Sequence, residues 1–189
     1  YVSQRANSLH LALVARLKRV ILDVARRRYS EGRSLRGLIL CGNGSHFCSG
    51  GDVHELNEML QQSGFTIPQM AAYWYQVGEV VLLMCQLAVP IATVPHGKTV
   101  GGGHILTMVG DVRVGVVDGT FSFGNIARGV TPVAGLCERM ARAIGVAGGL
   151  NYYFRDALLQ RNGSALSGDE ALSLRILTHL TSSVEEAKA

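Results

Sequence analysis

Several residue types that mark specialised proteins are scarce in this sequence. Cysteine occurs only four times in 189 residues, and never with the spacing of metal ligands. We interpret Cys41, Cys48, Cys85 and Cys137 as reduced core thiols of a cytoplasmic protein without a metal. We see no secretory signal and no apolar run of the ~18 residues that a membrane-spanning helix needs. Because the chain opens with Tyr1 and not methionine, we expect it to be a piece of a longer polypeptide.

Charged and aromatic residues are also few, at 17% and 6%, and the formal net charge is +4. No basic stripe interleaved with aromatic residues is present, so we expect no nucleic-acid partner. The densest group of cations, called the basic cluster below, comprises Arg26, Arg27, Arg28, Arg33 and Arg36. We interpret it as the solvated end of a helix, where cations complement the helix dipole. A patch for phosphate or for an acidic partner is the alternative.

Helix and strand patterns alternate along the chain. Apolar residues spaced by three to four predict a first helix capped by Asn7 or Ser8, and short apolar runs predict strands. The expected helices span 8–28, 54–62, 69–87, 101–110, 133–144, 147–160 and 171–176, the last after a Ser167–Glu170 capping box. The expected strands span 35–42, 90–97, 112–117 and 120–123. Such alternation predicts a single α/β domain over residues 1–189, with a parallel, crossover-connected sheet.

Two turns of small residues follow the first two strands and precede helices. They are Ser49-Gly50-Gly51 and Gly101-Gly102-Gly103. In α/β folds such junctions point unpaired N–H groups at the carboxyl edge of the sheet, where ligands bind. Close packing explains either turn alone, but two such turns can direct two N–H groups at one oxygen atom, forming an oxyanion hole. Neither turn has the G-x-G-x-x-G spacing of a dinucleotide-binding loop.

The order of motifs resembles that of the crotonase (enoyl-CoA hydratase/isomerase) superfamily. LRGLILCGNGSHFCSGGDVHEL, residues 35–56, is similar to the family's strand and turn that end in F-C-A-G-A-D-L-x-x-L. VPIATVPHGKTVGGGHILTMVGDVRV, residues 89–114, is similar to P-x-I-A-x-V-x-G-x-x-x-G-G-G-x-x-L-x-x-x-x-D. FSFGNIARGVTP, residues 121–132, resembles F-x-x-P/Q-E-x-x-x-G-x-x-P, and LSGDEALSLRIL, residues 166–177, resembles I-S-A-x-E-A-x-x-x-G-L.

This resemblance implies a ββα spiral that forms a trimer or hexamer and binds an acyl thioester of coenzyme A or of an acyl carrier protein. The thioester is the substrate, and no separate cofactor is implied. By position, the N–H groups of Gly51 and Gly102 donate to the thioester oxygen, and His54 lies where the family often has a lysine near the CoA phosphates. Further substrate contacts fall on Ser49, Gly50, Asp52, Ile105 and Ala127. The family's N-terminal hairpin and C-terminal helices have no counterpart, so we expect a fold truncated at both ends.

The two glutamates of the family's hydratases are missing. We place their positions at Ile105 and Ala127, which can neither activate water nor protonate carbon. Decarboxylation needs no such base, because loss of CO2 leaves an enolate that the oxyanion hole stabilises. RGVTPVAG, residues 128–135, further resembles the decarboxylases of polyketide β-branching. We therefore predict a lyase, with a catalytically silent thioester-binding or scaffolding subunit and a divergent enoyl-CoA hydratase as alternatives.

The acid that returns a proton to the enolate is a separate question. His96 precedes the second turn and His104 follows it, and histidine exchanges protons near neutral pH. Both are candidate proton donors, although a structural or surface role is the plainer interpretation. The polyketide decarboxylases are thought to use a lysine shortly after the first turn, but residues 52–62 contain none.

Overall fold

A computed structural model describes residues 6–30, 35–126, 129–158 and 165–189 of the chain. Helices and strands alternate along these residues, as predicted. The helices are α1 (Leu11–Ser30), α2 (Val53–Gln61), α3 (Ile67–Gln86), α4 (Gly102–Met108), α5 (Leu136–Leu158), α6 (Gly168–Ser173) and α7 (Val184–Lys188). The strands are β1 (Leu38–Cys41), β2 (Ile91–Val94), β3 (Lys98–Val100), β4 (Val112–Val116), β5 (Thr120–Ser122), β6 (Leu166–Ser167) and β7 (His179–Thr181).

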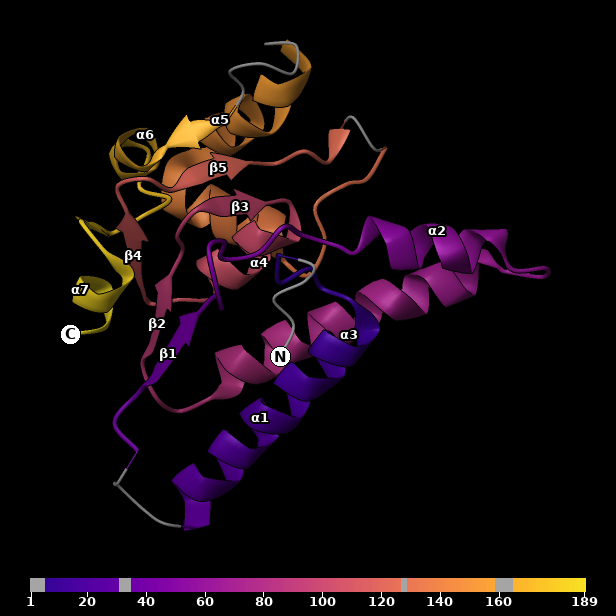
Figure 1. Cartoon of the computed structure of the whole chain (residues 1–189), viewed down its shortest axis with the longest axis horizontal. Coiled ribbons are helices and arrows are strands. Elements are labelled where there is room, and N and C mark those ends of the chain that lie inside the picture. The colour runs from indigo at the N-terminus through magenta and orange to yellow at the C-terminus, as the bar shows by residue number, and fades with distance from the viewer. Residues whose placement is uncertain (1–5, 31–34, 127–128, 159–164) are drawn as a thin grey trace.

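The strands form two small sheets, and β2, β3, β4 and β5 alternate between them along the chain. One sheet is parallel throughout, in the order β1-β2-β4-β7. In the other, with the order β3-β5-β6, β3 and β5 are parallel and β6 is antiparallel to β5. Thus β2 and β3 lead into α4, and β4 and β5 lead into α5, which makes two turns of a ββα spiral (Figure 1). The predicted α/β class with a parallel sheet is confirmed.

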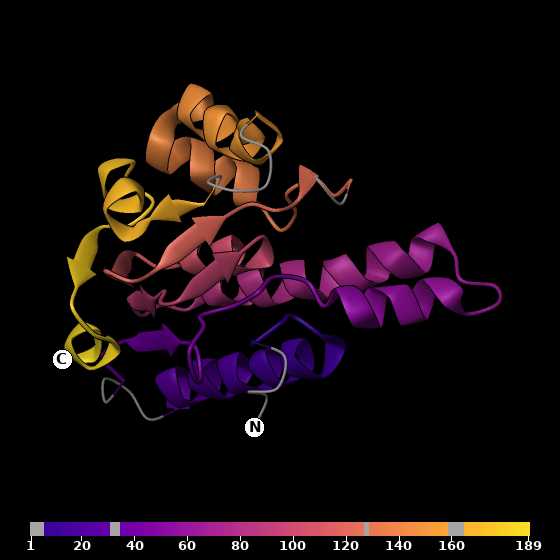
Figure 2. The ribbon, with the colours of Figure 1, turned by 45° about the horizontal axis from the view of Figure 1, so that its top comes forward.

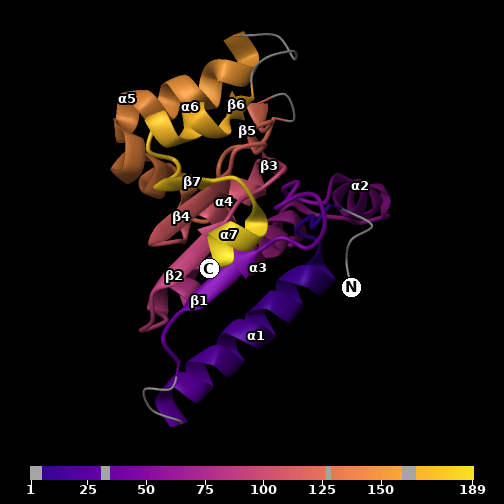
Figure 3. The same cartoon turned by 60° about the vertical axis from the view of Figure 1, so that its left-hand side comes forward.

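Two long helices, α1 and α3, pack side by side along the parallel sheet (Figures 1 and 3). Val14 and Ile21 of α1 and Val77 and Val81 of α3 are buried in the same core cluster, as the three-to-four spacing requires. Helix α2 folds back on α3 to form a hairpin that projects from the body of the protein (Figure 2). The site described below lies at the base of this hairpin.

The first helix starts later than predicted, and neither expected cap residue serves it. The Ser8 hydroxyl donates to Asp52 over 2.7 Å, so it joins the N-terminal segment to α2. The Asn7 amide donates to the carbonyl oxygens of Asn43 and His46, at 2.9 and 2.7 Å. Both side chains therefore tie distant segments together instead of capping α1.

Helix α5 covers the two helices predicted at 133–144 and 147–160. At Gly145 the backbone has φ 76° and ψ 161°, which interrupts the helical geometry and turns the second half of α5. The predicted boundary between residues 144 and 147 is therefore a real break. The Ser167–Glu170 capping box at the start of α6 is also present.

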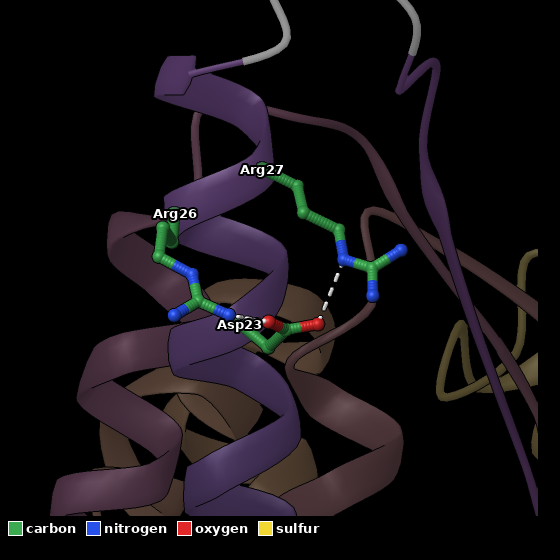
Figure 4. Close-up of polar contacts among 3 residues, drawn as sticks. All are labelled: Asp23, Arg26 and Arg27. Atoms are coloured by element: carbon green, nitrogen blue, oxygen red, sulfur yellow. Dashed lines mark hydrogen bonds and ion pairs between the residues drawn. The ribbon is translucent and has the colours of Figure 1, made fainter.

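Arg26, Arg27 and Arg28 of the basic cluster lie at the C-terminal end of α1, where a helix dipole favours cations, and Arg36 lies in the segment before β1. Asp23 accepts hydrogen bonds from Arg26 and Arg27, at 2.5 and 2.8 Å (Figure 4). The hydrogen bond from Arg26 is the main reason that the pKa of Asp23 is lowered. The exposed arginines are thus partly neutralised within their own helix, which supports the solvated-helix interpretation. Arg33 lies outside the described residues.

Two cysteines depart from the prediction of core thiols. Cys48 is fully buried, and burial raises the pKa of its thiol to about 12, so it remains a neutral thiol. Cys41 is half-buried, whereas Cys85 and Cys137 are exposed. Both exposed cysteines lie on exposed faces of long helices, α3 and α5, which an apolar sequence context does not reveal. Within the described ranges, no helix has the length and apolar character to cross a membrane.

Candidate active site

The first small-residue turn, Ser49-Gly50-Gly51, lies between β1 and α2. Ser49 donates its N–H to Ala6 over 3.0 Å, and the Gly50 carbonyl accepts from the N–H of Leu9 over 2.7 Å. Gly50 has φ +91°, a conformation that costs a residue with a Cβ about 1–2 kcal/mol. Glycine is therefore required here by the backbone alone, before any ligand is considered.

The second turn joins β3 to α4. Gly101 has φ 48° and caps the helix, and its N–H donates to Ser122 over 3.0 Å. Gly102 is the first residue of α4. Its N–H points out of the start of the helix, where no intrahelical acceptor exists.

A parallel bridge between Cys48 and Thr99 sets the two turns against each other. The Cys48 carbonyl accepts from the N–H of Val100 over 3.0 Å. A Cβ built on Gly50 would lie 2.8 Å from the Val100 oxygen and 3.2 Å from the Gly102 nitrogen. The small residues thus permit close packing of the turns, which was one of the two explanations for them.

Gly51 and Gly102 both line one cavity of about 330 Å³. Neither N–H group donates a hydrogen bond to any other described residue. Buried or half-buried backbone donors are rarely left without an acceptor, so an acceptor from outside the chain is the expected partner. The other predicted contact residues Ser49, Gly50, Asp52, His54 and Ile105 line the same cavity.

The cavity wall is mainly apolar. Its hydrophobic members come from α2, α3, β3, α4, α5 and the segment after β5, and they are Val53, Leu56, Trp74, Val100, Ile105, Phe123, Val130, Val133 and Leu136. Polar side chains are contributed by Ser8, Ser49, Asn125 and Thr131. Asp52 and His54 are the titratable residues among the described lining residues. No group of three or more potential metal ligands is found in the described part of the chain.

The Asp52 carboxylate is occupied by structural hydrogen bonds. Its Oδ1 accepts from the N–H groups of His54 and Glu55, at 3.1 and 3.0 Å, and thereby caps α2. Its Oδ2 accepts from the Ser8 hydroxyl. Asp52 is 2% exposed, so burial and these partners hold it in place as a cap. His54 is exposed in the first turn of α2, at the cavity wall. Its contact with CoA phosphates stays a prediction.

The two histidines proposed as proton donors lie elsewhere. His104 is fully buried, stacks on Phe123 at 5.0 Å and contacts the Tyr152 hydroxyl over 2.7 Å. It follows Gly103 directly, but the turn of α4 carries its side chain away from the cavity. We therefore correct its assignment to a structural residue of the aromatic core between α4 and α5.

His96 is also placed away from the cavity, at 5% exposure. Its Nδ1 and Nε2 atoms lie 3.0 and 3.1 Å from the carbonyl oxygens of Val94 and Gly44. Two carbonyl partners require both ring nitrogens to donate, which only the cation can do. A hydrogen bond with the Cys41 side chain is the largest cause that raises the pKa of His96 to about 9, and burial opposes it. His96 is corrected to a buried cation that joins strand ends.

The assignment of the second lost glutamate needs a correction. Ala127 lies outside the described residues, so its predicted substrate contact is not placed. Counting from Phe121 in F-x-x-P/Q-E, the glutamate position falls on Asn125 and not on Ala127. Asn125 lines the cavity, half-buried, in the segment that follows β5. A Cβ on Gly101 would lie 2.8 Å from its Oδ1. The spacing of the motif was the signal that identifies it.

Comparisons with known proteins agree with this architecture. The crystal structure of an enoyl-CoA hydratase/isomerase from Marinobacter aquaeolei superposes with a TM-score of 0.80 at 23% identity, over 99% of this chain and 66% of that one. An enoyl-CoA hydratase from Shewanella pealeana gives 0.82 at 18% identity, over 98% and 64%. At these identities the likeness establishes the fold.

Sequence comparison extends the likeness to named relatives. The protein of Mycobacterium leprae named "Probable enoyl-CoA hydratase echA12" is 32% identical over 143 residues, which are 75% of this chain and 47% of that protein. The peroxisomal Delta(3,5)-Delta(2,4)-dienoyl-CoA isomerase of Arabidopsis thaliana is 27% identical over 155 residues, 79% of this chain and 53% of that one. The chain thus spans about half the length of these relatives. The sequence profile named Enoyl-CoA hydratase/isomerase matches residues 3–156, so the chain belongs to the enoyl-CoA hydratase/isomerase family.

Proposed function

We propose that the chain carries the active site of an acyl-thioester decarboxylase, with the thioester oxygen held between the N–H groups of Gly51 and Gly102. The observation that carries this proposal is that both unbonded N–H groups belong to one cavity. Donors fixed by backbone geometry need no reorganisation when charge develops on the oxygen. Each such donor contributes about 3–4 kcal/mol to transition-state stabilisation in well-studied acyl-transfer enzymes.

The absence of a usable carboxylate base favours decarboxylation over hydration. A hydratase needs one group to activate water and another to protonate carbon. Ile105 and Asn125 cannot act as such bases, and Asp52, the one carboxylate among the described lining residues, caps α2. An apolar wall also disfavours a substrate carboxylate relative to neutral CO2.

The proposed reaction consists of two steps. First, the C–C bond to the substrate carboxylate breaks, CO2 leaves, and the electron pair passes to the α-carbon and the thioester oxygen as an enolate or dienolate. Second, a proton adds to carbon and the thioester carbonyl is restored. Suitable substrates are β-carboxy or vinylogous carboxy thioesters such as a methylglutaconyl group, carried by coenzyme A or by a carrier protein.

We assign the returning proton to His54. It is the described lining residue whose side-chain type exchanges protons near neutral pH. This role replaces the predicted contact with the CoA phosphates, because the phosphates and the reacting carbon lie at opposite ends of the ligand. His54→Gln should then retain thioester binding but lose turnover by about 10²-fold, the lower range for general acid catalysis. Equal turnover of this variant and the wild type would exclude His54 as the donor.

A panel of carboxylated and enoyl thioesters, incubated with the protein and followed by mass spectrometry, tests the proposal. We expect a mass loss corresponding to CO2 from methylglutaconyl thioester and no addition of water to crotonyl thioester. Hydration of crotonyl thioester instead would favour the divergent hydratase. Binding of thioesters without any mass change would favour the catalytically silent subunit.

A further inference from the structure

The single tryptophan of the chain, Trp74, belongs to the cavity. It lies on α3, and its indole edge faces the first small-residue turn. A Cβ built on Gly51 would lie 2.7 Å from Cη2 of Trp74 and 3.5 Å from Cζ3. The indole therefore lies against the residue that supplies one of the two unbonded N–H groups.

Its neighbour Tyr73 restricts how Trp74 can move. The two rings are perpendicular, with centroids 4.8 Å apart. Tyr73 is 1% exposed, and its hydroxyl donates to the Leu9 carbonyl and accepts from the N–H of Asp52 over 3.4 Å. Burial raises the pKa of Tyr73 to about 12, so this hydroxyl stays protonated and keeps its donor role. Trp74 thus packs against a fixed partner.

Other side chains of the cavity wall are held in place by the core. Ile105, Phe123 and Leu136 are each at most 2% exposed and belong to the hydrophobic core, so this part of the wall cannot yield without loss of packing. A cavity of about 330 Å³ holds the equivalent of about eleven water molecules at roughly 30 Å³ each. A bulky indole beside the Gly51 N–H leaves less room in this cavity for an acyl group than a small side chain would.

We propose that Trp74 limits the acyl group to short, compact chains, and so determines the substrate class of this site. The inference rests on thioester binding as proposed above, but not on which reaction follows. A rigid aromatic side chain is suited to this role, because it excludes volume with little conformational freedom of its own. Discrimination of this kind is worth about 10–200-fold per methylene group in a hydrophobic pocket.

The fluorescence of Trp74 can also be used to measure ligand binding at this cavity. Because no other tryptophan is present, a change in tryptophan fluorescence on ligand addition arises from this residue. Titration of the wild type with butyryl-CoA should give a saturable change in emission. Titration with dodecanoyl-CoA should need at least tenfold higher concentration for the same change. Equal affinity for the two thioesters would overturn the inference.

Variants separate the size of Trp74 from a general effect on α3. The Kd for dodecanoyl-CoA divided by the Kd for butyryl-CoA, both measured by equilibrium dialysis, should be at least tenfold lower in Trp74→Ala than in the wild type. Trp74→Phe should give an intermediate ratio. Tyr75→Ala is the matched control, because Tyr75 is the next residue on α3 and 77% exposed, and it should leave the ratio unchanged. An unchanged ratio in Trp74→Ala would also overturn the inference.

The binding readout distinguishes this inference from the proposed reaction. Size-dependent binding without CO2 release would support the role of Trp74 and exclude the decarboxylase. CO2 release from short and long carboxylated thioesters at equal kcat/KM would exclude the role of Trp74 and support the decarboxylase. Binding of neither thioester would contradict both.

Discussion

Cys48 and Thr99 pair as an isolated parallel bridge that joins the strand ends from which the two small-residue turns begin. The hydrogen bonds of the bridge run from Cys48 to Lys98 and from Val100 to Cys48, at 3.3 and 3.0 Å. Because the connection is made by the backbone, the positions of Gly51 and Gly102 are set by the fold itself. The two N–H donors are thus preorganised by the backbone and need no side chain to position them.

Gly50→Ala should damage this junction. The new Cβ would have to adopt φ +91° and would lie 2.8 Å from the Val100 oxygen. We expect the free energy of unfolding to fall by more than the ~1–2 kcal/mol that the left-handed conformation alone costs. Gly64→Ala is the control, since Gly64 has φ +83° and no atom within 4 Å of a built Cβ. Equal losses for the two variants in urea unfolding would show that the turns are not packed tightly.

Asp52→Asn tests whether this carboxylate has a structural or a chemical role. Asparagine is as good a helix cap as aspartate, so the free energy of unfolding should fall by only about 1 kcal/mol for the altered Ser8 contact. Turnover should be retained, because the account gives Asp52 no proton to transfer. A loss of kcat of ~10²-fold or more, without unfolding, would identify Asp52 as a general acid or base and contradict this account.

Asn125→Glu should slow decarboxylation. Two like charges ~4 Å apart repel by about 4 kcal/mol at an effective dielectric constant of 20. Since ~1.4 kcal/mol of barrier changes a rate tenfold, even part of this repulsion is measurable. Protonation of the introduced glutamate removes the repulsion at low pH, so the loss of decarboxylation rate should increase as pH rises. CO2 release should be measured across pH for this variant and for Asn125→Gln as the neutral control. Equal rates of the two variants at high pH would place residue 125 away from the substrate carboxylate, or exclude decarboxylation.

The raised pKa of His96 predicts that the free energy of unfolding depends on pH. Its pKa in the folded protein, about 9, is above the ordinary histidine value of about 6.5. The folded state therefore binds the proton more tightly, so this stabilisation is complete below about pH 6.5 and is lost as pH rises through about 9. Unfolding by urea at several pH values in this window should show the decline, and His96→Gln should lack that part of the slope. A wild type and variant with parallel pH profiles would mean that His96 is not a buried cation.

Strong local patterns were sufficient to predict much of the fold. The apolar run of α3 and the capping box before α6 were identified because their signals lie within a few residues. Strand β3 was missed, because three residues carry too little pattern and the strand depends on its pairing with β5. The orientation of His104 was equally out of reach, since Phe123 and Tyr152 that hold it come from distant segments.

The glycine turns and Asn125 show what a structural repeat adds to a sequence pattern. The first two turns stand out by composition, because each consists of three small residues. In the register of β3 and β5, Val100 pairs with Ser122, so Phe123 and Gly124 correspond to Gly101 and Gly102 one spiral turn later, and Asn125 follows them. The sequence lacks a glycine triplet there, and only the ββα repeat makes the equivalence visible.

The central claim is that the N–H of Gly102 stabilises the thioester oxygen, and replacement of that residue tests it most directly. Gly102→Pro removes the N–H at the first position of α4, where proline is well tolerated. Gly102→Ala keeps the N–H and adds the same Cβ, which in both variants meets the flexible end of Leu9 at 2.7 Å. With both variants shown to be folded by their unfolding transitions, CO2 release from methylglutaconyl thioester should be slower in Gly102→Pro than in Gly102→Ala by about 10²–10³-fold. Equal rates for the two variants would contradict the account.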